Sequence, residues 1–234
     1  LCSDFTVIVS TWGHQDGEIP LRRLWNALKV LYWRIRQKAD QISQNKGVWE
    51  IFNPALSWSR RLPFGGVRRL ISANRRNLRD AIEYFGGIDL IHAHVAYPAG
   101  FIAAVLSEEF RIPYVVTEHM SPFPFPSLMN GGAPIPDISM AFANASAVIA
   151  VSPALAERVA SFGYPFPLVI PNVVDERRFS PSTPEQGKFV FFTLCLLSEQ
   201  KGIDHLLEAI SLWNPLPDGV EFWIGGDGPL REKF

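Results

Sequence analysis

Polar residues stand at the ends of two apolar segments of the sequence. His92 and His94 close the segment DLIHAH, and Glu118 and His119 close the segment VVTEH. Residues two apart on a β-strand point to the same face, so His92 and His94 are predicted to lie side by side. Imidazoles can contact a sugar hydroxyl or a phosphate, or carry a proton near neutral pH. We predict functional roles for His94 and His119 and a buried, supporting role for His92.

A second group of residues is suited to binding an anion. Lys201 and Gly202 lie between the apolar segment 188–194 and a helical pattern, so the lysine is predicted beside free backbone amides at a helix start. Gly226 and Gly228 follow the next apolar segment, where glycine allows the backbone to approach a ligand closely. The alternatives are a solvated surface lysine and an ordinary strand-to-helix turn.

The hydrophobic pattern predicts the strands and helices that would position these residues. Apolar runs typical of strands occur at 5–9, 88–93, 113–117, 147–151, 168–170, 188–194 and 220–225. Most are continuous, as in parallel strands that are covered on both faces. Helical patterns or start signals occur at 20–38, 66–84, 98–107, 152–159 and 202–213, and a Pro/Gly-rich stretch at 121–137 is predicted to be a loop. The alternation predicts an α/β fold with a mainly parallel sheet, in which ligands bind at the carboxyl ends of the strands.

The sequence predicts two domains of unequal length. Residues 1–172 are expected to form a Rossmann-like domain, and residues 173–187, in a stretch rich in proline, serine and charge, are expected to be a linker. Residues 188–234 begin a second βαβ arrangement that is too short to bury a core of its own. We therefore expect the chain to be a fragment that lacks much of its second domain and its first strand.

Composition narrows the function classes. Of 234 residues, 47% are hydrophobic and 19% are charged, and two cysteines can build neither a disulfide framework nor a zinc cluster. No apolar run reaches the ~18 residues of a membrane-spanning helix. Neither a dinucleotide fingerprint, nor a P-loop, nor a G-x-S-x-G elbow is present. We expect a cytoplasmic protein.

Charge is divided unevenly along the chain. Residues 1–79 carry a balance of +9, whereas the remainder carries −10, and five of the seven tryptophans lie in the first 58 residues. The basic region 20–79 predicts peripheral contact with an anionic membrane at its inner face. The alternative is a solvated helical face with tryptophans in the core. Since the net charge is −1, no nucleic-acid partner is expected.

Six segments carry a resemblance to a known family. In chain order they are DLIHAH, IPYVVTEH, ASAVIAVSPALAE, VIPNVVD-x-x-x-F-x-P, EQKGIDHLLEA and IGGDGPL. Together they resemble the family-four glycosyltransferases over residues 85–234. That family comprises retaining enzymes with the two-domain GT-B fold. The resemblance implies an amino-terminal domain for the acceptor, a carboxyl-terminal domain for the nucleotide-sugar, and the transferred sugar in the cleft between them.

The resemblance also assigns roles to individual residues. His94 would lie near the transferred sugar, Asn172 would lie at the hinge between the domains, and Lys201 would bind the donor diphosphate. Leu196 and Cys195 stand where the family usually carries arginine and glycine, which leaves one cation at this position. The family's later E-x7-E element would lie beyond the sequence. The donor-binding residues expected on this basis are Lys201, Gly226, Gly228, Asn172 and Glu118.

The sequence thus predicts a retaining, metal-independent glycosyltransferase of polysaccharide biosynthesis, with His94 and His119 as catalytic residues. It would move a sugar from a nucleoside-diphosphate sugar to a glycan or lipid-linked acceptor, without a cofactor, and the fragment alone is expected to be inactive. Lys201 and nearby amides could stabilise the leaving diphosphate in place of a metal, and no Asp-x-Asp motif is present. One alternative is a metal-dependent hydrolase built on His92, His94 and His119. Another is a non-catalytic module that binds a nucleotide-sugar or glycan.

Overall fold

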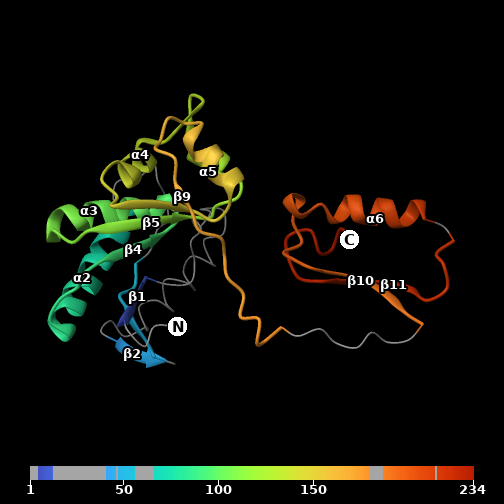
Figure 1. Ribbon diagram of the computed structural model, residues 1–234, viewed down its shortest axis with the longest axis horizontal. Helices are drawn as coiled ribbons and strands as arrows, with labels where there is room; N and C mark the ends of the chain where they lie inside the picture. The colour runs from blue at the N-terminus through green and yellow to red at the C-terminus, as the bar shows by residue number, and fades with distance from the viewer. Residues whose placement is uncertain (1–4, 13–40, 46, 56–65, 180–186, 214) are drawn as a thin grey trace, which may run out of the picture. The chain divides into compact units, whose positions relative to one another are not determined.

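The computed structural model describes residues 5–12, 41–45, 47–55, 66–179, 187–213 and 215–234. The chain divides into two compact units, Leu1–Val173 and Val174–Phe234 (Figure 1). Both contain parallel strands connected through helices, which confirms the predicted α/β class. The helix predicted over 20–38 lies outside the described residues.

A four-stranded parallel sheet forms the centre of the first unit. Its strands, in spatial order, are β4 (Ile91–His94), β5 (Tyr114–Glu118), β8 (Ala147–Ala150) and β9 (Leu168–Val169). The helices between these strands are α3 (Phe101–Phe110), α4 (Pro136–Ala143) and α5 (Pro153–Ala160). A π-helical turn, Ala96–Gly100, precedes α3. Each of these strands starts and ends within three residues of the apolar segment that predicted it.

The core of this sheet depends on close packing between β5 and α4. Tyr114 and Val116 on β5 are buried, and Ile138 and Phe142 on α4 lie in the same apolar cluster. Gly100 lies where a Cβ atom would be 3.0 Å from the Ala141 Cβ and 3.2 Å from the Val95 carbonyl oxygen. The turn before α3 can therefore lie this near α4 only because position 100 has no side chain.

Helix α5 begins as the sequence predicts. Ser152 is its N-cap, and the Ser152 hydroxyl accepts a hydrogen bond of 3.2 Å from the amide of Leu155. Pro153 occupies the first turn, where its missing N–H costs nothing. This hydroxyl satisfies one of the amides that a helix start leaves without a partner.

A second sheet was only partly predicted. Strand β1 (Val7–Thr11) pairs in parallel with β3 (Val48–Phe52), which pairs antiparallel with β2 (Gln41–Asn45). The hairpin of β2 and β3 lies inside the basic region, where no strand was expected. Helix α2 (Val67–Phe85) contacts β1, β3 and α3, and ends at Gly86 in the left-handed conformation. Among the described residues, no helix combines the length and apolar character needed to cross a membrane.

The stretch 121–137 is more ordered than the expected loop. It holds a 3-10 turn (Pro126–Leu128), the short strands β6 (Met129–Asn130) and β7 (Ala133–Pro134), and the first residues of α4. Proline explains the error, because Pro136 stands in the first turn of α4, where its fixed φ favours the helix.

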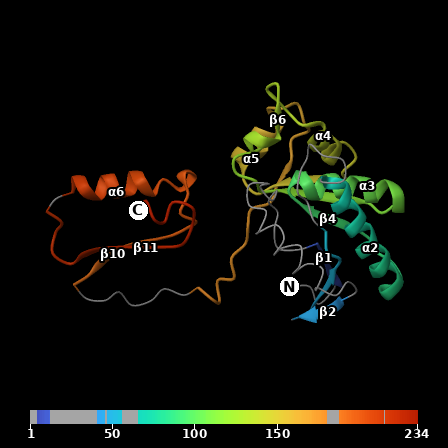
Figure 2. The same cartoon turned by 180° about the vertical axis from the view of Figure 1, so that it is seen from behind.

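The second unit is a βαβ arrangement of β10 (Phe189–Leu194), α6 (Ile203–Leu212) and the parallel strand β11 (Val220–Gly225). Helix α6 lies along one face of the two strands (Figure 2). Phe191 stacks on Phe222 with ring centroids 4.9 Å apart. The side chains of Phe192, Leu194 and Trp223 are 65%, 70% and 55% exposed. Since side chains alternate along a strand, these three residues mark the face opposite the Phe191–Phe222 pair.

Candidate active site

Three imidazoles lie together at the carboxyl edge of β4 and β5. The rings of His92 and His94 are stacked with centroids 4.6 Å apart, and the ring of His119 lies 5.6 Å from that of His94. His119 directly follows β5, and the parallel register sets His94 beside Thr117. The structure thus brings together the two residues predicted to be catalytic.

The predicted buried role of His92 is wrong. His92, His94 and His119 are all exposed. The alternation of β4 explains this, because buried Ala93 occupies the opposite face while both histidines share the other. The Nε2 atom of His92 lies 2.8 Å from the hydroxyl oxygen of Thr117 on β5. Thr117 was not predicted to belong to the site, although the register pairs His92 with Val115 and His94 with Thr117, which puts Thr117 on the histidine face.

The surroundings of the two strand histidines favour the uncharged imidazole. Although both rings keep exposed surface, partial desolvation by the protein lowers the pKa of His92 and of His94 below the ordinary value. The neighbouring imidazole is the second cause, since His94 lowers the pKa of His92 and His119 lowers that of His94. A neutral imidazole has one donor and one acceptor nitrogen, which suits it to bind a hydroxyl group.

Glu118 is not presented to a ligand, in contrast to its expected place among the donor-binding residues. Its side chain has no exposed surface, and it shares the buried face of β5 with Tyr114 and Val116. Its Oε2 atom accepts a 2.8 Å hydrogen bond from the amide of Ala96, and its Oε1 atom accepts a 2.7 Å bond from the amide of Met120. Both oxygens are thus occupied by backbone.

An unpredicted polar cluster joins α2 to the carboxyl ends of β1 and β3. Asn77 is 1% exposed; its side-chain amide donates to the Ser10 hydroxyl at 2.8 Å and its oxygen accepts from Asn53 at 2.7 Å. The Ser10 hydroxyl donates in turn to Asn74 at 2.6 Å. The spacing of the two α2 asparagines gave the signal, because residues three apart share one helix face. The cluster fastens α2 to the strand ends.

In the second unit, Lys201 lies at the turn where it was expected. It closes a 3-10 turn, Glu199–Lys201, and is exposed, and Gly202 follows in the left-handed conformation with φ of 64°. Ile203 is buried and begins α6. The lysine side chain therefore extends from the start of a helix, where backbone amides favour an anion.

Gly226 and Gly228 have a packing role within the same unit. Gly226 has φ of 139°, and a Cβ atom at this position would overlap the carbonyl oxygen of Cys195. A Cβ atom at Gly228 would overlap the backbone of Leu197. The amide of Leu197 donates a 2.8 Å hydrogen bond to the Asp227 carbonyl oxygen. The glycines thus let the segments after β10 and β11 lie side by side, while donor contact by either glycine stays a prediction.

Two further expectations concern Asn172 and a metal ion. Asn172 is exposed, next to the end of the first unit at Val173. Within the described part of the chain, no three or more His, Cys, Asp or Glu side chains are grouped so that they could hold a metal ion. The three imidazoles are close to one another but do not form such a group.

The family model and the two relatives that match this chain are all glycosyltransferases. The family model for Glycosyltransferase Family 4 matches residues 36–178. The putative teichuronic acid biosynthesis glycosyltransferase TuaC of Bacillus subtilis is 32% identical over 179 residues, which cover 71% of this chain and 44% of TuaC. The uncharacterized glycosyltransferase MJ1178 of Methanocaldococcus jannaschii is 30% identical over 172 residues, which cover 73% of this chain and 45% of MJ1178.

Among solved structures, the complex of Arabidopsis thaliana UGT89C1 with UDP-L-rhamnose aligns with 94% of this chain and 61% of that one, at 12% identity and a TM-score of 0.41. The chain spans less than half the length of the two relatives above. Because the family match covers more than half of the sequence, including both strand histidines and His119, the chain belongs to Glycosyltransferase Family 4.

Proposed function

We propose that the complete protein transfers a sugar from a nucleoside-diphosphate sugar to a glycan or lipid-linked acceptor, with retention of configuration and without a metal ion. The observation that carries the proposal is the exposed contact of His94 and His119 at the carboxyl edge of a parallel sheet. That edge is where open α/β sheets bind ligands. Membership in the family supports the reaction class.

The lowered pKa of His94 fits this chemistry. Glycosyl transfer passes through a centre that resembles an oxocarbenium ion, which carries positive charge. A protonated imidazole beside that centre would oppose the charge, whereas a neutral one can accept or donate a hydrogen bond to a sugar hydroxyl. We therefore assign His94 and His119 to contact with the transferred sugar.

The leaving diphosphate needs positive charge of its own. Lys201 and the amides at the start of α6 would provide it, because preorganised donors stabilise charge that develops in the transition state. Leu196, where the family usually carries an arginine, is 58% exposed and brings no charge. Lys201 therefore carries more of this task than in a two-cation site. Gly226, Gly228 and Asn172 remain proposed donor contacts.

The name of one relative supports a glycan acceptor. TuaC is named for teichuronic acid biosynthesis, so we propose a polysaccharide as the product. Nucleoside-diphosphate sugars are substrates in this scheme, and no cofactor is proposed.

The test uses the complete protein with a panel of nucleoside-diphosphate sugars, once in the presence of a chelator and once with added divalent metal ions. Release of nucleoside diphosphate that depends on an added acceptor, with retained anomeric configuration by NMR, is the expected result. Phosphate-ester hydrolysis that requires added metal would favour the hydrolase alternative instead. Donor binding without turnover would favour a binding module, and no binding to any donor would contradict the proposal.

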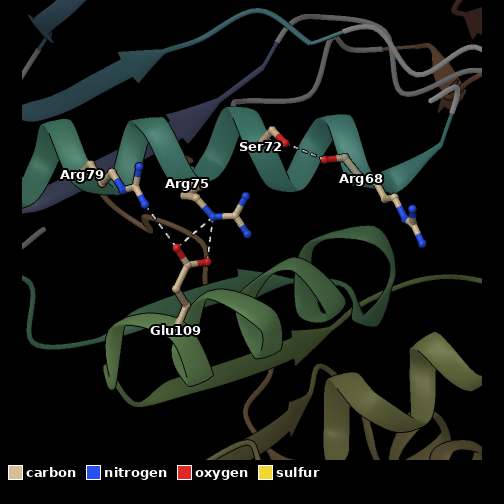
Figure 3. A network of polar contacts seen from close by, with 5 residues as sticks. All are labelled: Arg68, Ser72, Arg75, Arg79 and Glu109. Carbon is tan, nitrogen blue, oxygen red and sulfur yellow. Dashed lines mark hydrogen bonds and ion pairs between the residues drawn. The ribbon is translucent and has the colours of Figure 1, made fainter.

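We also propose that the basic face of α2 contacts an anionic membrane from the cytoplasmic side. Glu109 on α3 accepts hydrogen bonds from Arg75 at 2.7 and 3.0 Å, and lies 3.4 Å from Arg79 (Figure 3). Arg68 and Arg76 on the same helix are exposed, and no ion pair of theirs with the described residues is found. In Figure 3 the Arg68 side chain extends away from Glu109.

Charge and geometry support this contact. Arg68, Arg69 and Arg76 are exposed. Viewed along the axis of α2, their positions fall within an arc of about 100°, so they share one face of the helix. Each basic residue near an anionic bilayer contributes about 1 kcal/mol. The three together therefore suffice for weak, salt-sensitive binding, which would bring the protein near a lipid-linked acceptor.

A further inference from the structure

Glu118 combines complete burial with an unusual set of partners. Its carboxyl group lies beneath the histidine edge, on the buried face of β5. The two oxygens accept hydrogen bonds from two different chain segments, one at Ala96 and one at Met120. A buried carboxyl group is costly unless its oxygens are satisfied. The fold therefore keeps an ionisable group in its interior and uses it to bind backbone.

The two bonded amides lie next to the two histidines of the proposed site. Ala96 is two residues after His94, and Met120 directly follows His119. One side chain thus joins the turn that follows β4 to the turn that follows β5. The ladder of β4 and β5 sets His94 beside Thr117, and Glu118 adds a second link between the segments that carry His94 and His119.

The turn after β4 needs such support. Val95 has φ of 66°, in a region that β-branched residues rarely adopt. Its amide donates a 2.9 Å hydrogen bond to the Thr117 carbonyl oxygen, and its carbonyl oxygen accepts one of 2.9 Å from Gly100. The Ala96–Glu118 bond holds the next peptide. Strained backbone of this kind persists only where the surroundings fix it.

The net effect of the surroundings on Glu118 is a raised pKa, which favours the neutral acid. Burial raises the pKa of its carboxyl group, while the amides of Ala96, Met120 and His119 and the His119 ring act to lower it. The ionised form accepts bonds at both oxygens, whereas the neutral acid must present one O–H donor. Only the ionised form can thus satisfy the amides of Ala96 and Met120 without competition.

We propose that Glu118 is a positioning residue: by holding the amides of Ala96 and Met120, it fixes the imidazoles of His94 and His119 in contact. The importance of this role for catalysis rests on the proposed function. The positioning itself can be tested without any substrate.

The test compares Glu118→Gln with the parent chain of 234 residues by NMR. Glutamine keeps the size of the side chain but offers one acceptor oxygen and one NH2 donor group, so one of the two amides loses its partner. The matched control is Glu108→Gln, which makes the same chemical change at an exposed position on α3. The probes are the amide resonances of Ala96 and Met120 and the Overhauser effect between the His94 and His119 rings.

In Glu118→Gln we expect at least one of the two amide resonances to shift and the ring-to-ring effect to fall by half or more. In Glu108→Gln both readouts should match the parent. Unchanged amides and an unchanged ring-to-ring effect in a folded Glu118→Gln chain would overturn the proposal. If that variant does not fold, Glu118→Asp replaces it: the shorter carboxylate keeps the charge but cannot reach both amides, so both readouts should change, and their constancy would overturn the proposal equally.

A kinetic arm separates this role from the proposed function. In the complete protein, Glu118→Gln should lower kcat tenfold or more while donor affinity changes less than twofold. Absence of turnover in the parent with every donor would contradict the proposed function alone, and the NMR result would still decide the role of Glu118. Equal kcat in Glu118→Gln and an active parent would overturn the positioning role in catalysis.

Discussion

The Nε2 atom of His92 lies 2.8 Å from the hydroxyl oxygen of Thr117, one parallel strand away. This hydrogen bond orients the first of three imidazoles; His94 stacks on His92, and the tilted ring of His119 lies beside His94. The side chains of a strand pair thus set the direction of rings that we propose to meet the substrate.

Removal of the Thr117 hydroxyl should release His92. Valine has nearly the same shape as threonine, so Thr117→Val is expected to reduce the free energy of unfolding by only about 0.5–1.5 kcal/mol, the usual net worth of one hydrogen bond. The imidazole nitrogen shifts of His92 should change as its tautomer loses its partner. Thr193→Val on β10 is the matched control. His92 nitrogen shifts equal to those of the parent would show that the bond does not form in solution.

Acid should destabilise the fold through His92 and His94. Their folded pKa values are lowered from 6.5, so the unfolded chain binds these protons more readily. Stability is therefore lost as the pH falls from about 6.5 toward the folded values. Thermal unfolding at pH 7.5 and 5.5 should show a smaller loss in the double variant His92→Asn, His94→Asn than in the parent.

Glu118 acts in the opposite direction in that experiment. Its raised pKa makes its contribution greatest below its ordinary value of 4.5, and the contribution declines as the pH rises. Because the parent and the double variant both keep Glu118, their difference isolates the histidines. An equal loss of stability in the two proteins would contradict the assignment.

The sequence predicted the strands of the four-stranded sheet because most of them are continuous apolar runs between polar turns. The sequence did not predict strands in the region where basic residues and tryptophans dominate the composition. The hairpin of β2 and β3 contains alternating residues around Gly47, which has φ of 82°, but its position in a basic, tryptophan-rich region favoured another interpretation. Such a hairpin is stabilised by pairing with β1, which a local pattern does not contain.

The sequence predicted which residues gather at the site, but not which face of its strand each side chain occupies. Strand alternation could have placed Glu118 with Tyr114 and Val116 on the buried face, and Thr117 on the face of the histidines. Residue type suggested instead that a carboxylate at a strand end faces a ligand. The tie from Glu118 to Ala96 joins residues 22 apart in the sequence, and only the parallel pairing of β4 and β5 brings them together.

Lys201 is expected to bind the donor diphosphate. Lys201→Ala in the complete protein should weaken nucleoside-diphosphate binding by about 1.5–3 kcal/mol, the range for a hydrogen bond to a charged group. The control is Lys233→Ala, which removes the same charge from another exposed position of the second unit. Calorimetric titration measures both. Parent-like affinity in Lys201→Ala would show that the phosphate assignment is wrong.

Membrane binding should depend on the arginines of α2 that Glu109 does not engage. Sedimentation with vesicles should show binding that rises with the anionic lipid fraction and falls with salt, since screening shortens the field to about 8 Å at physiological ionic strength. The triple variant Arg68→Gln, Arg69→Gln, Arg76→Gln should lose most of this binding, since each charge contributes about 1 kcal/mol to the binding free energy. The control removes Arg177, Arg178 and Arg231 instead. Equal binding by the two triple variants, or none by the parent, would contradict the membrane proposal.

The most direct test of the account is steady-state kinetics of the complete protein with His94→Ala. If His94 contacts the transferred sugar in the transition state, kcat should fall by about a hundredfold or more, at the scale of a lost positioned proton donor or acceptor. The dissociation constant for the donor should change little, because we propose that Lys201 and the α6 amides bind the diphosphate. A His94→Ala enzyme with the kcat of the parent would contradict the placement of the reaction at this histidine edge.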